Sequence, residues 1–254
     1  MLAEERFKLI LDILEKRKAV TVVELVEELN TSESTIRRDL IALGNMNKLK
    51  KVHGGATLIE GSYNTKEEDF NTKYSLNVEE KKNIGKFAAS LIDKDDFVYI
   101  DAGTSTDYMV DYIEEKRANY VTNGIAHAKK LVQKGCNVSI IGGQLKISTE
   151  AIIGIEAINS LKKYNFTKCF MGVNGIDLKA GFTTPDISEA LLKDEAIIRS
   201  QKVYVLGDSS KFNRVSSVTF GNLEKATVIT SKINEKEFKN NENIVEVENL
   251  WFIQ

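Results

Sequence analysis

The sequence holds few of the residues that build covalent or metal-bound frameworks. Its 254 residues include two cysteines, two histidines and one proline. Cys136 and Cys169 are too few and too isolated for a disulfide framework or a zinc site, which favours reduced thiols in a cytoplasmic protein. We therefore predict neither a metal site nor a cofactor.

Long apolar runs and an excess of one charge are also missing. No run approaches the length of a membrane span, and Glu4 and Glu5 in the first amphipathic segment do not fit a secretory signal, so a soluble protein without a membrane partner is expected. The 35 basic and 37 acidic side chains give a net charge of −2, which excludes a generally polycationic nucleic-acid binder. With 42% hydrophobic residues, the chain can bury a sizeable core and is expected to hold two domains.

The most informative stretch is Thr31-Ser-Glu-Ser-Thr-Ile-Arg-Arg-Asp-Leu40, in which Ser32 is a good helix N-cap. At helical spacing, Ile36, Leu40 and Leu43 form an inward stripe. The outward face and its flanks then carry Ser34, Thr35, Arg37, Arg38, Ile41 and Ala42. Arginines among small residues suit a DNA major groove, where arginine reaches phosphates or guanine. In isolation, an ordinary solvated helix face would look the same.

The surroundings of this segment favour DNA binding. Apolar spacing from Phe7 to Leu14 predicts a first helix closed by Lys16–Ala19 and a second over Val23–Leu29, with a tight turn into the arginine segment. Downstream, residues 48–58 alternate in polarity around a Gly54-Gly55 turn, which indicates a β-hairpin wing on the phosphate backbone. The predicted DNA-binding residues are Ser34, Thr35, Arg37, Arg38, Lys50, Lys51 and His53.

Charge supports this locally. Residues 1–30 carry five basic and seven acidic side chains, net −2, whereas residues 31–58 carry five basic and two acidic side chains, net +3. A basic edge of this size fits phosphate contact but binds DNA weakly in one copy. We therefore expect a homodimer or homotetramer that places several copies on paired half-sites of double-stranded operator DNA.

The second half alternates short apolar runs with helical segments, which predicts a mainly parallel sheet with helices on both faces. The predicted strands are 97–100, 120–121, 138–141, 168–173, 203–206 and 227–230, and the helices lie near 78–92, 107–116, 125–134, 151–164 and 187–200. A polar stretch over 59–77 is predicted as a linker that docks on the following domain through Phe70 and Tyr74. The domains are then 1–58 and 78–254.

Ligands of such sheets bind beyond the carboxyl ends of the strands. Asp101-Ala-Gly-Thr-Ser-Thr106 follows the first strand and opens a helix, where hydroxyls beside exposed amides suit a phosphate, although a plain hydroxyl-rich cap is an equal alternative. Five polar strand ends together predict a polyol phosphate site. Its predicted residues are Asp101, Gly103, Thr104, Ser105, Thr106, Thr122, Asn123, Gly142, Gly143, Asn174, Asp186, Glu189, Lys193 and Lys211.

Four ionisable residues have competing interpretations. Glu189 and Lys193 lie at i, i+4, which suits either a surface ion pair or contact with sugar hydroxyls. Glu150 is interpreted as an acid at the start of a helix. His127 lies on a helix with no visible carboxylate partner, so a structural role is expected.

Ser32-Glu-Ser-Thr-Ile-Arg-Arg-Asp-Leu40 joined to Val52-His-Gly-Gly-Ala56 resembles the start of the DeoR family of bacterial sugar-responsive transcriptional regulators. The hinge Gly44-Asn-Met-Asn47 departs from the family's pattern. The resemblance extends along nearly the whole chain. It implies an α/β protein with an N-terminal winged helix-turn-helix and a C-terminal α/β sensor domain resembling ribose-5-phosphate isomerase.

The isomerase resemblance covers binding but not chemistry. Ala102-Gly-Thr-Ser-Thr106 keeps the phosphate loop of the isomerase in outline. Met171-Gly-Val-Asn174 stands where its acidic segment lies, and Gly181-Phe-Thr-Thr-Pro185 stands near its lysine loop without a lysine. Aldose–ketose isomerisation needs a positioned base. We therefore predict a sensor without catalytic residues.

Within the family, Ala151–Gly154, Gly181–Asp186 and Glu189–Lys193 look most like fructose-operon repressors. That resemblance implies a repressor released by a phosphorylated fructose, typically fructose 1-phosphate. Repressors answering to tagatose, galactitol or deoxyribose phosphates stay open. Two other classes also stay open: a phosphosugar isomerase-like enzyme with an accessory DNA-binding domain, and a DNA-binding module whose second domain only assembles oligomers.

Overall fold

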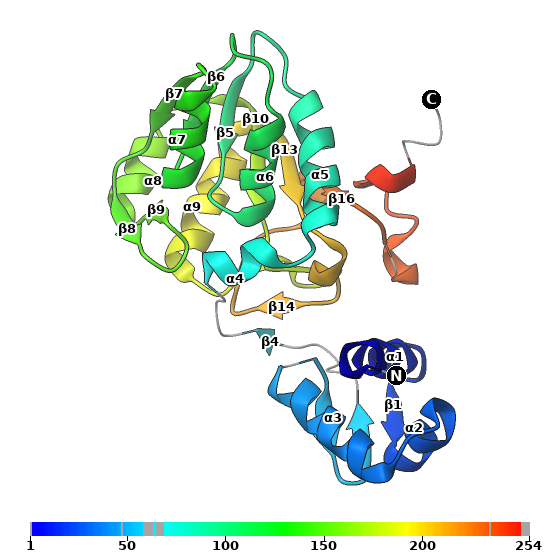
Figure 1. Ribbon diagram of the computed structural model, residues 1–254. Helices are drawn as coiled ribbons and strands as arrows, with labels where there is room; N and C mark the ends of the chain where they lie inside the picture. Colours follow the sequence, from blue (N-terminus) through cyan, green and yellow to red (C-terminus); the bar gives the residue numbers. More distant parts are fainter. Residues whose placement is uncertain (1, 47, 58–62, 65–68, 234, 250–254) are drawn as a thin grey trace. The chain divides into compact units, whose positions relative to one another are not determined.

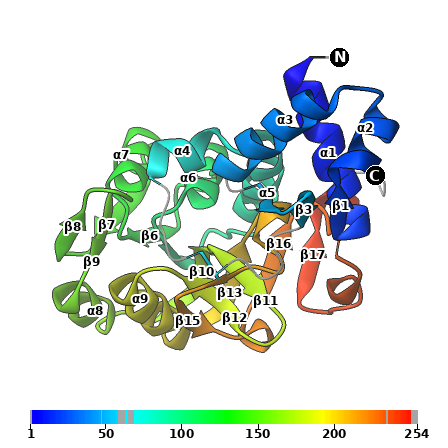
Figure 2. The ribbon, with the colours of Figure 1, turned by 90° about the horizontal axis from the view of Figure 1, so that it is seen from below.

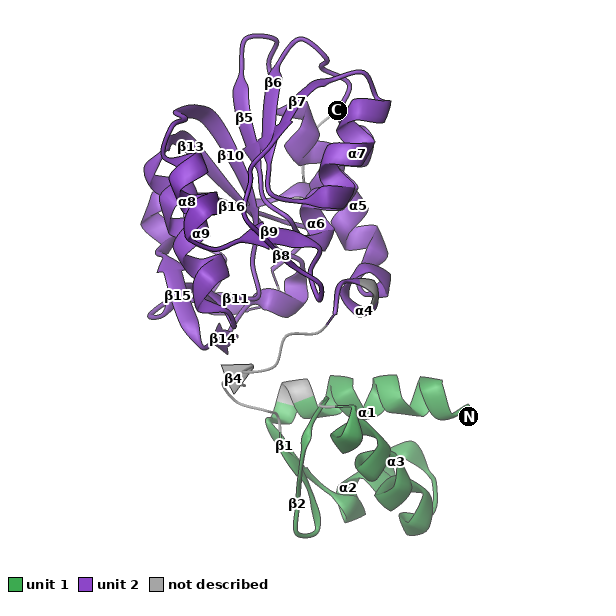
Figure 3. Cartoon of the chain, turned by 90° about the vertical axis from the view of Figure 1, so that its left-hand side faces the viewer, with its two compact units in different colours: residues 1–62 green, residues 63–254 purple. Residues whose placement is uncertain are grey.

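The computed structural model describes residues 2–46, 48–57, 63–64, 69–233 and 235–249. The chain divides into two compact units, residues 1–62 and residues 63–254 (Figure 3). In the described residues, no helix is both long enough and apolar enough to cross a membrane.

The first unit combines three helices with a small antiparallel sheet (Figure 1). Ile36, Leu40 and Leu43 are buried in its core, so the predicted inward stripe is confirmed. The strands are ordered β1-β3-β2. The elements are α1 (Ala3–Arg17), β1 (Ala19–Thr21), α2 (Val22–Leu29), α3 (Glu33–Asn45), β2 (Lys50–Val52) and β3 (Gly55–Thr57).

The wing hairpin turns one residue earlier than the sequence predicts. His53 and Gly54 form the turn, with Gly54 at φ +80°, and Gly55 already belongs to β3. A Cβ on Gly55 would lie 2.1 Å from the carbonyl oxygen of Val20. Gly55 is therefore required by the close approach of β1, a contact between strands that the local sequence does not reveal. Leu58, at the end of the predicted wing, lies outside the described residues.

The second unit is built on a seven-stranded parallel sheet of order β17-β16-β13-β10-β5-β6-β7. Helices α5, α6 and α7 cover one face and α8 and α9 the other, as Figures 1 and 2 show. The predicted parallel sheet is confirmed, and β17 is an addition. The strands are β5 (Phe97–Ile100), β6 (Asn119–Thr122), β7 (Asn137–Ile140), β10 (Phe166–Gly172), β13 (Ser200–Leu206), β16 (Thr227–Thr230) and β17 (Ile244–Glu246).

The helices of this unit and its smaller elements surround the sheet. The helices are α4 (Phe70–Ser75), α5 (Val78–Ser90), α6 (Thr104–Tyr112), α7 (Ile125–Gln133), α8 (Ile155–Leu161) and α9 (Ile187–Ile198), with 3-10 turns η1 (Ser209–Lys211), η2 (Leu223–Lys225), η3 (Lys236–Phe238) and η4 (Val247–Asn249). The smaller sheets pair β4 (Tyr63–Asn64) with β14 (Val215–Ser216), β8 (Gln144–Lys146) with β9 (Ala151–Ile153), and β11 (Gly175–Asp177), β12 (Gly181–Thr184) and β15 (Val218–Gly221) in the order β11-β12-β15.

The helix predicted over 151–164 is wrong in its first turn. Ala151–Ile153 form β9, and Gly154 at φ +96° separates this strand from α8. A short run of buried apolar residues fits a strand and a helix equally well by pattern, and pairing with β8 decides for the strand. Glu150 lies in the turn between β8 and β9, so its interpretation as a helix-start acid is wrong.

The predicted linker is partly helical where it is described. Residues 59–62 and 65–68 lie outside the described residues, and α4 follows. The ring of Tyr74 stacks on Tyr108 of α6 with centroids 4.6 Å apart, and Phe70 stacks on Tyr74 at 5.8 Å. Docking through Tyr74 is confirmed by its contact with Tyr108, whereas Phe70 stacks on Tyr74 within the same predicted linker.

Candidate functional site

The outward face of α3 presents one arginine with no ionic partner. Arg38 is exposed and forms no ion pair with any residue in the described part of the chain. Arg37 is held by Glu33 at 2.6 Å, one turn earlier on the same helix. The hydroxyls of Ser34 and Thr35 lie 3.0 and 2.8 Å from the N-cap hydroxyl of Ser32. Arg38 is therefore the side chain of this face with the greatest freedom to reach a base edge.

A buried ion pair that was not predicted from the sequence holds α3 against α1. Asp39 is 5% exposed and receives a two-pronged contact from Arg6 of α1, with Nη2 3.0 Å from Oδ1. The pair holds the helix so that Arg38, its neighbour in sequence, faces away. The sequence feature that could have indicated this pair was Asp39, an acidic residue beside the inward apolar stripe.

The wing supplies exposed cations. Lys48, Lys50, Lys51 and His53 are all exposed on or beside β2, as a phosphate-contacting edge requires.

The candidate effector site lies where the order of the strands in the sheet reverses. β5 and β10 are neighbouring parallel strands, but β6 and β7 follow on one side and β13, β16 and β17 on the other. Loops that leave two such strands diverge and open a crevice at their carboxyl ends. Here the loops are Asp101–Gly103 and Val173–Asn174.

A hollow occupies this crevice. It brings together seven of the predicted residues with six that were not predicted for the site, and it measures ≈50 Å³. Three lysines against one glutamate make its lining cationic. The lining residues are Phe70, Lys73, Ala102, Gly103, Thr104, Ser105, Thr149, Gly172, Val173, Asn174, Glu189, Lys193 and Lys211.

Lys193, which lines the hollow, is held in place by a buried carboxylate. Its Nζ pairs with Asp101 Oδ2 and donates to the carbonyl of Gly172 at 3.0 Å, and Asp101 also accepts the Gly172 amide at 3.1 Å. Burial raises the pKa of Asp101, and the nearby Lys193 opposes that rise. Asp101 itself does not line the hollow, so its part is to place Lys193.

Glu189 belongs to a separate network on the same helix. Its carboxylate accepts from Lys146 at 3.0 Å and from the hydroxyls of Thr149 and Thr184 at 3.1 and 3.3 Å. Glu189 and Lys193 are 8% and 5% exposed and bind other partners, so a surface ion pair between them is wrong. Lys146 and Thr149 come from the first strand and the turn of the β8–β9 hairpin, which lie ahead of the helix predicted over 151–164.

Asp186 caps α9 and does not line the hollow. Its Oδ1 accepts the amides of Ser188 and Glu189 at 2.8 and 3.1 Å, and Lys146 lies 3.0 Å from Oδ2. Burial acts to raise the pKa of Asp186, but the hydrogen bonds from Lys146 and these amides lower it below its ordinary value.

Three of the residues predicted for the site support the loop Asp101–Gly103 and do not line the hollow. The Thr106 hydroxyl donates to the carbonyl of Asp101 at 2.6 Å and is fully buried. Asn123 accepts the Ala102 amide at 2.7 Å, and Thr122 accepts the amide of Gly124 at 3.0 Å. We therefore leave Thr106, Thr122 and Asn123 out of the proposed ligand set.

Gly142 and Gly143 also lie outside the lining of the hollow. A Cβ on Gly143 would meet the carbonyl oxygen of Ile153 at 2.7 Å, so this glycine serves close packing against β9.

His127 lies behind the phosphate loop. Its Nε2 is 3.0 Å from the Thr106 hydroxyl, and its Nδ1 is 4.0 Å from Asp107, whose other oxygen lies 2.6 Å from Lys130. Burial, followed by the charge of Lys130, lowers the pKa of His127 to about 3, so the ring is neutral at physiological pH. This agrees with the structural role expected for it.

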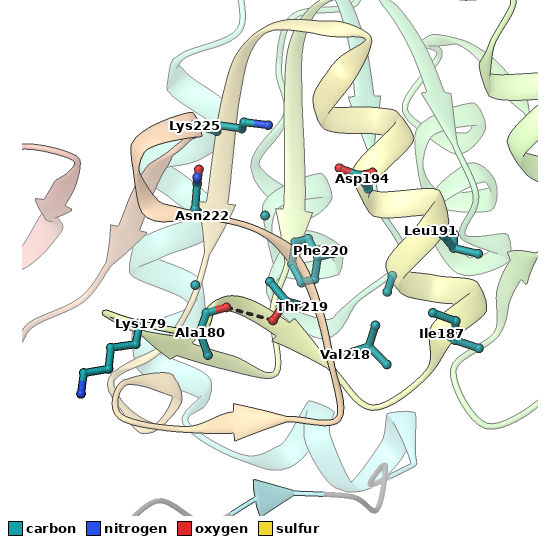
Figure 4. A pocket seen from close by; sticks show the side chains of 13 residues that line it. Lys179, Ala180, Ile187, Leu191, Asp194, Val218, Thr219, Phe220, Asn222 and Lys225 are labelled. Carbon is teal, nitrogen blue, oxygen red and sulfur yellow. Dashed lines mark hydrogen bonds between the residues drawn. The ribbon is translucent and has the colours of Figure 1, made fainter.

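A second hollow of ≈350 Å³ lies between α9 and β15 (Figure 4). Ile187, Leu191 and Phe220 line it, and the charged residues around it are exposed. The Thr219 hydroxyl donates to the carbonyl of Ala180 at 3.0 Å. Although larger, this hollow has no buried charged side chain in its lining and no strand end of the parallel sheet, so the smaller hollow fits a phosphosugar better.

Two protein-family models match the chain. A DeoR-like helix-turn-helix domain matches residues 6–62, and a DeoR C-terminal sensor domain matches residues 76–232.

Curated relatives match nearly the whole chain. The uncharacterized HTH-type transcriptional regulator FruR of Bacillus subtilis (strain 168) is 43% identical over 241 residues, which are 94% of this chain and 95% of the relative. A lactose phosphotransferase system repressor of Staphylococcus aureus (strain NCTC 8325 / PS 47) is 31% identical over 92% of this chain and 93% of its own. The HTH-type transcriptional regulator IolR of Bacillus subtilis (strain 168) is 31% identical over 86% and 87%.

Among solved structures, a ribose 5 phosphate isomerase A from Neisseria gonorrhoeae matches with 13% identity and a TM-score of 0.40 over 54% of each chain. A likeness of this size supports no conclusion about what the chain does.

Proposed function

The chain belongs to the DeoR family of transcriptional regulators, and we propose that it represses a sugar-utilisation operon, that of fructose, until a phosphorylated sugar such as fructose 1-phosphate releases it from its operator. Like its relatives, it is a transcriptional regulator and not an enzyme. The proposal includes a cytoplasmic location. It also includes a homodimer or homotetramer, because one basic face of net charge +3 binds DNA weakly alone.

The observation that carries the effector assignment is a cationic hollow at the start of α6. α6 begins at Thr104 without a side-chain cap from any described residue, so its first-turn amides remain for a ligand. Lys211 lines the same hollow and forms no ion pair within the described part of the chain. We assign the phosphate to Thr104, Ser105 and Lys211.

The remaining lining residues suit the hydroxyls of the sugar. Asn174 offers both donors and acceptors, Glu189 offers acceptors, and Lys193 adds donors beside them. Asp101 and Asp186 support this set from behind, through Lys193 and Lys146. A free sugar would use these groups but not the phosphate loop.

Fructose is favoured over other sugars by the name and the 43% identity of the FruR relative. The 31% identical relatives are named for lactose phosphotransferase and as IolR, so a tagatose, galactitol or deoxyribose phosphate is the alternative effector.

The test is operator binding titrated against a panel of sugars. An operator is first selected by the chain from random double-stranded DNA. Fructose 1-phosphate, fructose 6-phosphate, tagatose 6-phosphate and free fructose are then added to the complex. Release at the lowest concentration by fructose 1-phosphate supports the proposal, and release by none of the phosphates refutes it.

A further inference from the structure

Helix α4 is a wall of the effector hollow that no sequence motif indicated. Phe70 and Lys73 line the hollow from this helix. α4 is also the first helix after the linker that leads from the DNA-binding unit. A ligand in the hollow therefore touches the end of that linker directly.

The hollow is too small for the ligand we propose. It measures ≈50 Å³, whereas pockets that hold small molecules span about 300–1,000 Å³. A sugar phosphate must move part of the lining to bind. Which wall moves determines which other part of the chain the ligand affects.

α4 is one of the less buried walls, and it is the one that follows the linker. Ser105, Glu189 and Lys193, which line the walls from α6 and α9, are all less than 9% exposed. Lys211 on η1 and Thr149 in the β8–β9 turn are half-buried, as Phe70 and Lys73 are. None of the α4 side chains that the structure describes is fully buried, so displacing α4 exposes little of the core.

Contacts with several elements keep α4 in place. The Phe70 amide donates to the carbonyl of Ser148 at 3.0 Å, and the Lys81 ammonium donates to the carbonyl of Lys73. Tyr74 stacks on Tyr108 at 4.6 Å with the ring planes 15° apart, and the Tyr108 hydroxyl donates to the Tyr74 carbonyl at 3.4 Å. The Lys130 ammonium lies 5.9 Å from the Tyr74 ring. Tyr108 lies one turn after Thr104 on α6, so the phosphate loop and the seat of α4 share one helix.

The second described part of the linker is tied to the same hollow. β4 pairs in parallel with β14, with Tyr63 opposite Val215 and Asn64 opposite Ser216. β14 follows η1, whose Lys211 lines the hollow. Of the described residues of the predicted linker, α4 is therefore anchored to a helix that lines the hollow, and β4 to a strand that begins four residues after Lys211.

We propose that α4 is the movable wall of the effector site: the sugar phosphate binds by displacing α4 from Tyr108 while Lys73 contacts the ligand, and this displacement lowers operator affinity through the linker. The inference rests on the proposed function and adds the element that couples its two sites. A ligand shifts such an equilibrium only by its preference for one state, and the effect is reciprocal. Weakening the seat of α4 must therefore tighten effector binding and loosen operator binding together.

The test compares two neighbouring residues that should act in opposite directions. Tyr74→Ala removes the stack on Tyr108, so fructose 1-phosphate should bind the DNA-free chain more tightly and operator affinity without ligand should fall. The gain in the first and the loss in the second should multiply to about 2- to 13-fold. Lys73→Met removes a ligand contact and should weaken fructose 1-phosphate binding about 10- to 150-fold with operator affinity unchanged. Tyr112→Ala, an exposed tyrosine on α6, is the control and should change neither.

Calorimetry without DNA and operator binding without effector give the two readouts. Structural damage in Tyr74→Ala would weaken effector binding, so a tighter constant separates displacement from damage. Weaker effector binding in Tyr74→Ala, or no change in either affinity, overturns the inference. Should the parent chain bind no fructose 1-phosphate, the proposed effector fails, while operator affinity of Tyr74→Ala without ligand still decides the coupling.

Discussion

The exposed basic residues of the first unit and the hollow of the second unit use charge in opposite ways. Arg38, Lys50 and Lys51 are exposed, and in the proposed function they meet charges on DNA. In the hollow, Lys193 is buried and already bound to Asp101. A charge on a surface costs little to hold, whereas a buried charge must be paired. Changes at the surface should therefore alter recognition, and changes in the hollow should alter folding as well.

The largest expected effect is at the buried pair. Lys193→Met leaves Asp101 buried without its cation, which should lower the free energy of unfolding by about 3–5 kcal/mol. The double variant Asp101→Asn, Lys193→Met removes both charges and should recover most of the loss. Urea unfolding followed by circular dichroism measures both. A single variant as stable as the parent would show that the pair is not buried as described.

At the DNA-facing surface the effect should fall on specificity. Arg38→Ala should weaken the selected operator by about 1–3 kcal/mol and random DNA much less, because a guanine contact carries sequence information. Arg37→Ala is the matched control, since Glu33 already engages Arg37 and its loss should cost less. Equal losses on operator and random DNA for Arg38→Ala would mean that it only contacts phosphate.

His127 provides a pH-dependent measure of burial. Its pKa is about 3 in the folded chain and about 6.5 when unfolded. Below pH 6.5 the unfolded state binds a proton that the folded state does not, so the free energy of unfolding should fall by about 1.4 kcal/mol per pH unit toward pH 3. His127→Asn should lack this slope. Denaturation at pH 7, 6 and 5 compares the two, and parallel slopes would contradict a buried neutral ring.

The smallest effect is expected at the wing. Lys50→Ala and Lys51→Ala should each weaken operator and random DNA alike and reduce the slope of log affinity against log salt by about 1. Binding measured across a salt series tests this. A change in sequence preference would show that the wing contacts bases.

The two regions also differ in how far the sequence predicts them. The outward face of α3 lies on one helix, so helical periodicity alone separates Arg38 from Leu40. The hollow draws on segments from α4 to η1, and periodicity cannot tell which side chain of each segment points inward. Thr104 lines the hollow and Thr106 is turned into the core, although both were predicted for the phosphate.

Tertiary contacts account for the other differences. Lys73 was missed because its segment was interpreted as a linker, and Thr149 because it lies between predicted elements; only packing places them at the hollow. Gly55 and Asp39 likewise owe their roles to β1 and to Arg6, which lie more than 30 residues away in sequence.

The most direct test of the account is operator release by Thr104→Val. Valine keeps the volume of threonine and removes the hydroxyl at the start of α6, far in sequence from the helix-turn-helix. The variant should bind its operator as tightly as the parent and need about 10- to 150-fold more fructose 1-phosphate for release, if a charged hydrogen bond is lost. Release of parent and variant at the same concentration, or release of the parent by free fructose as readily as by its phosphate, would contradict the phosphate assignment.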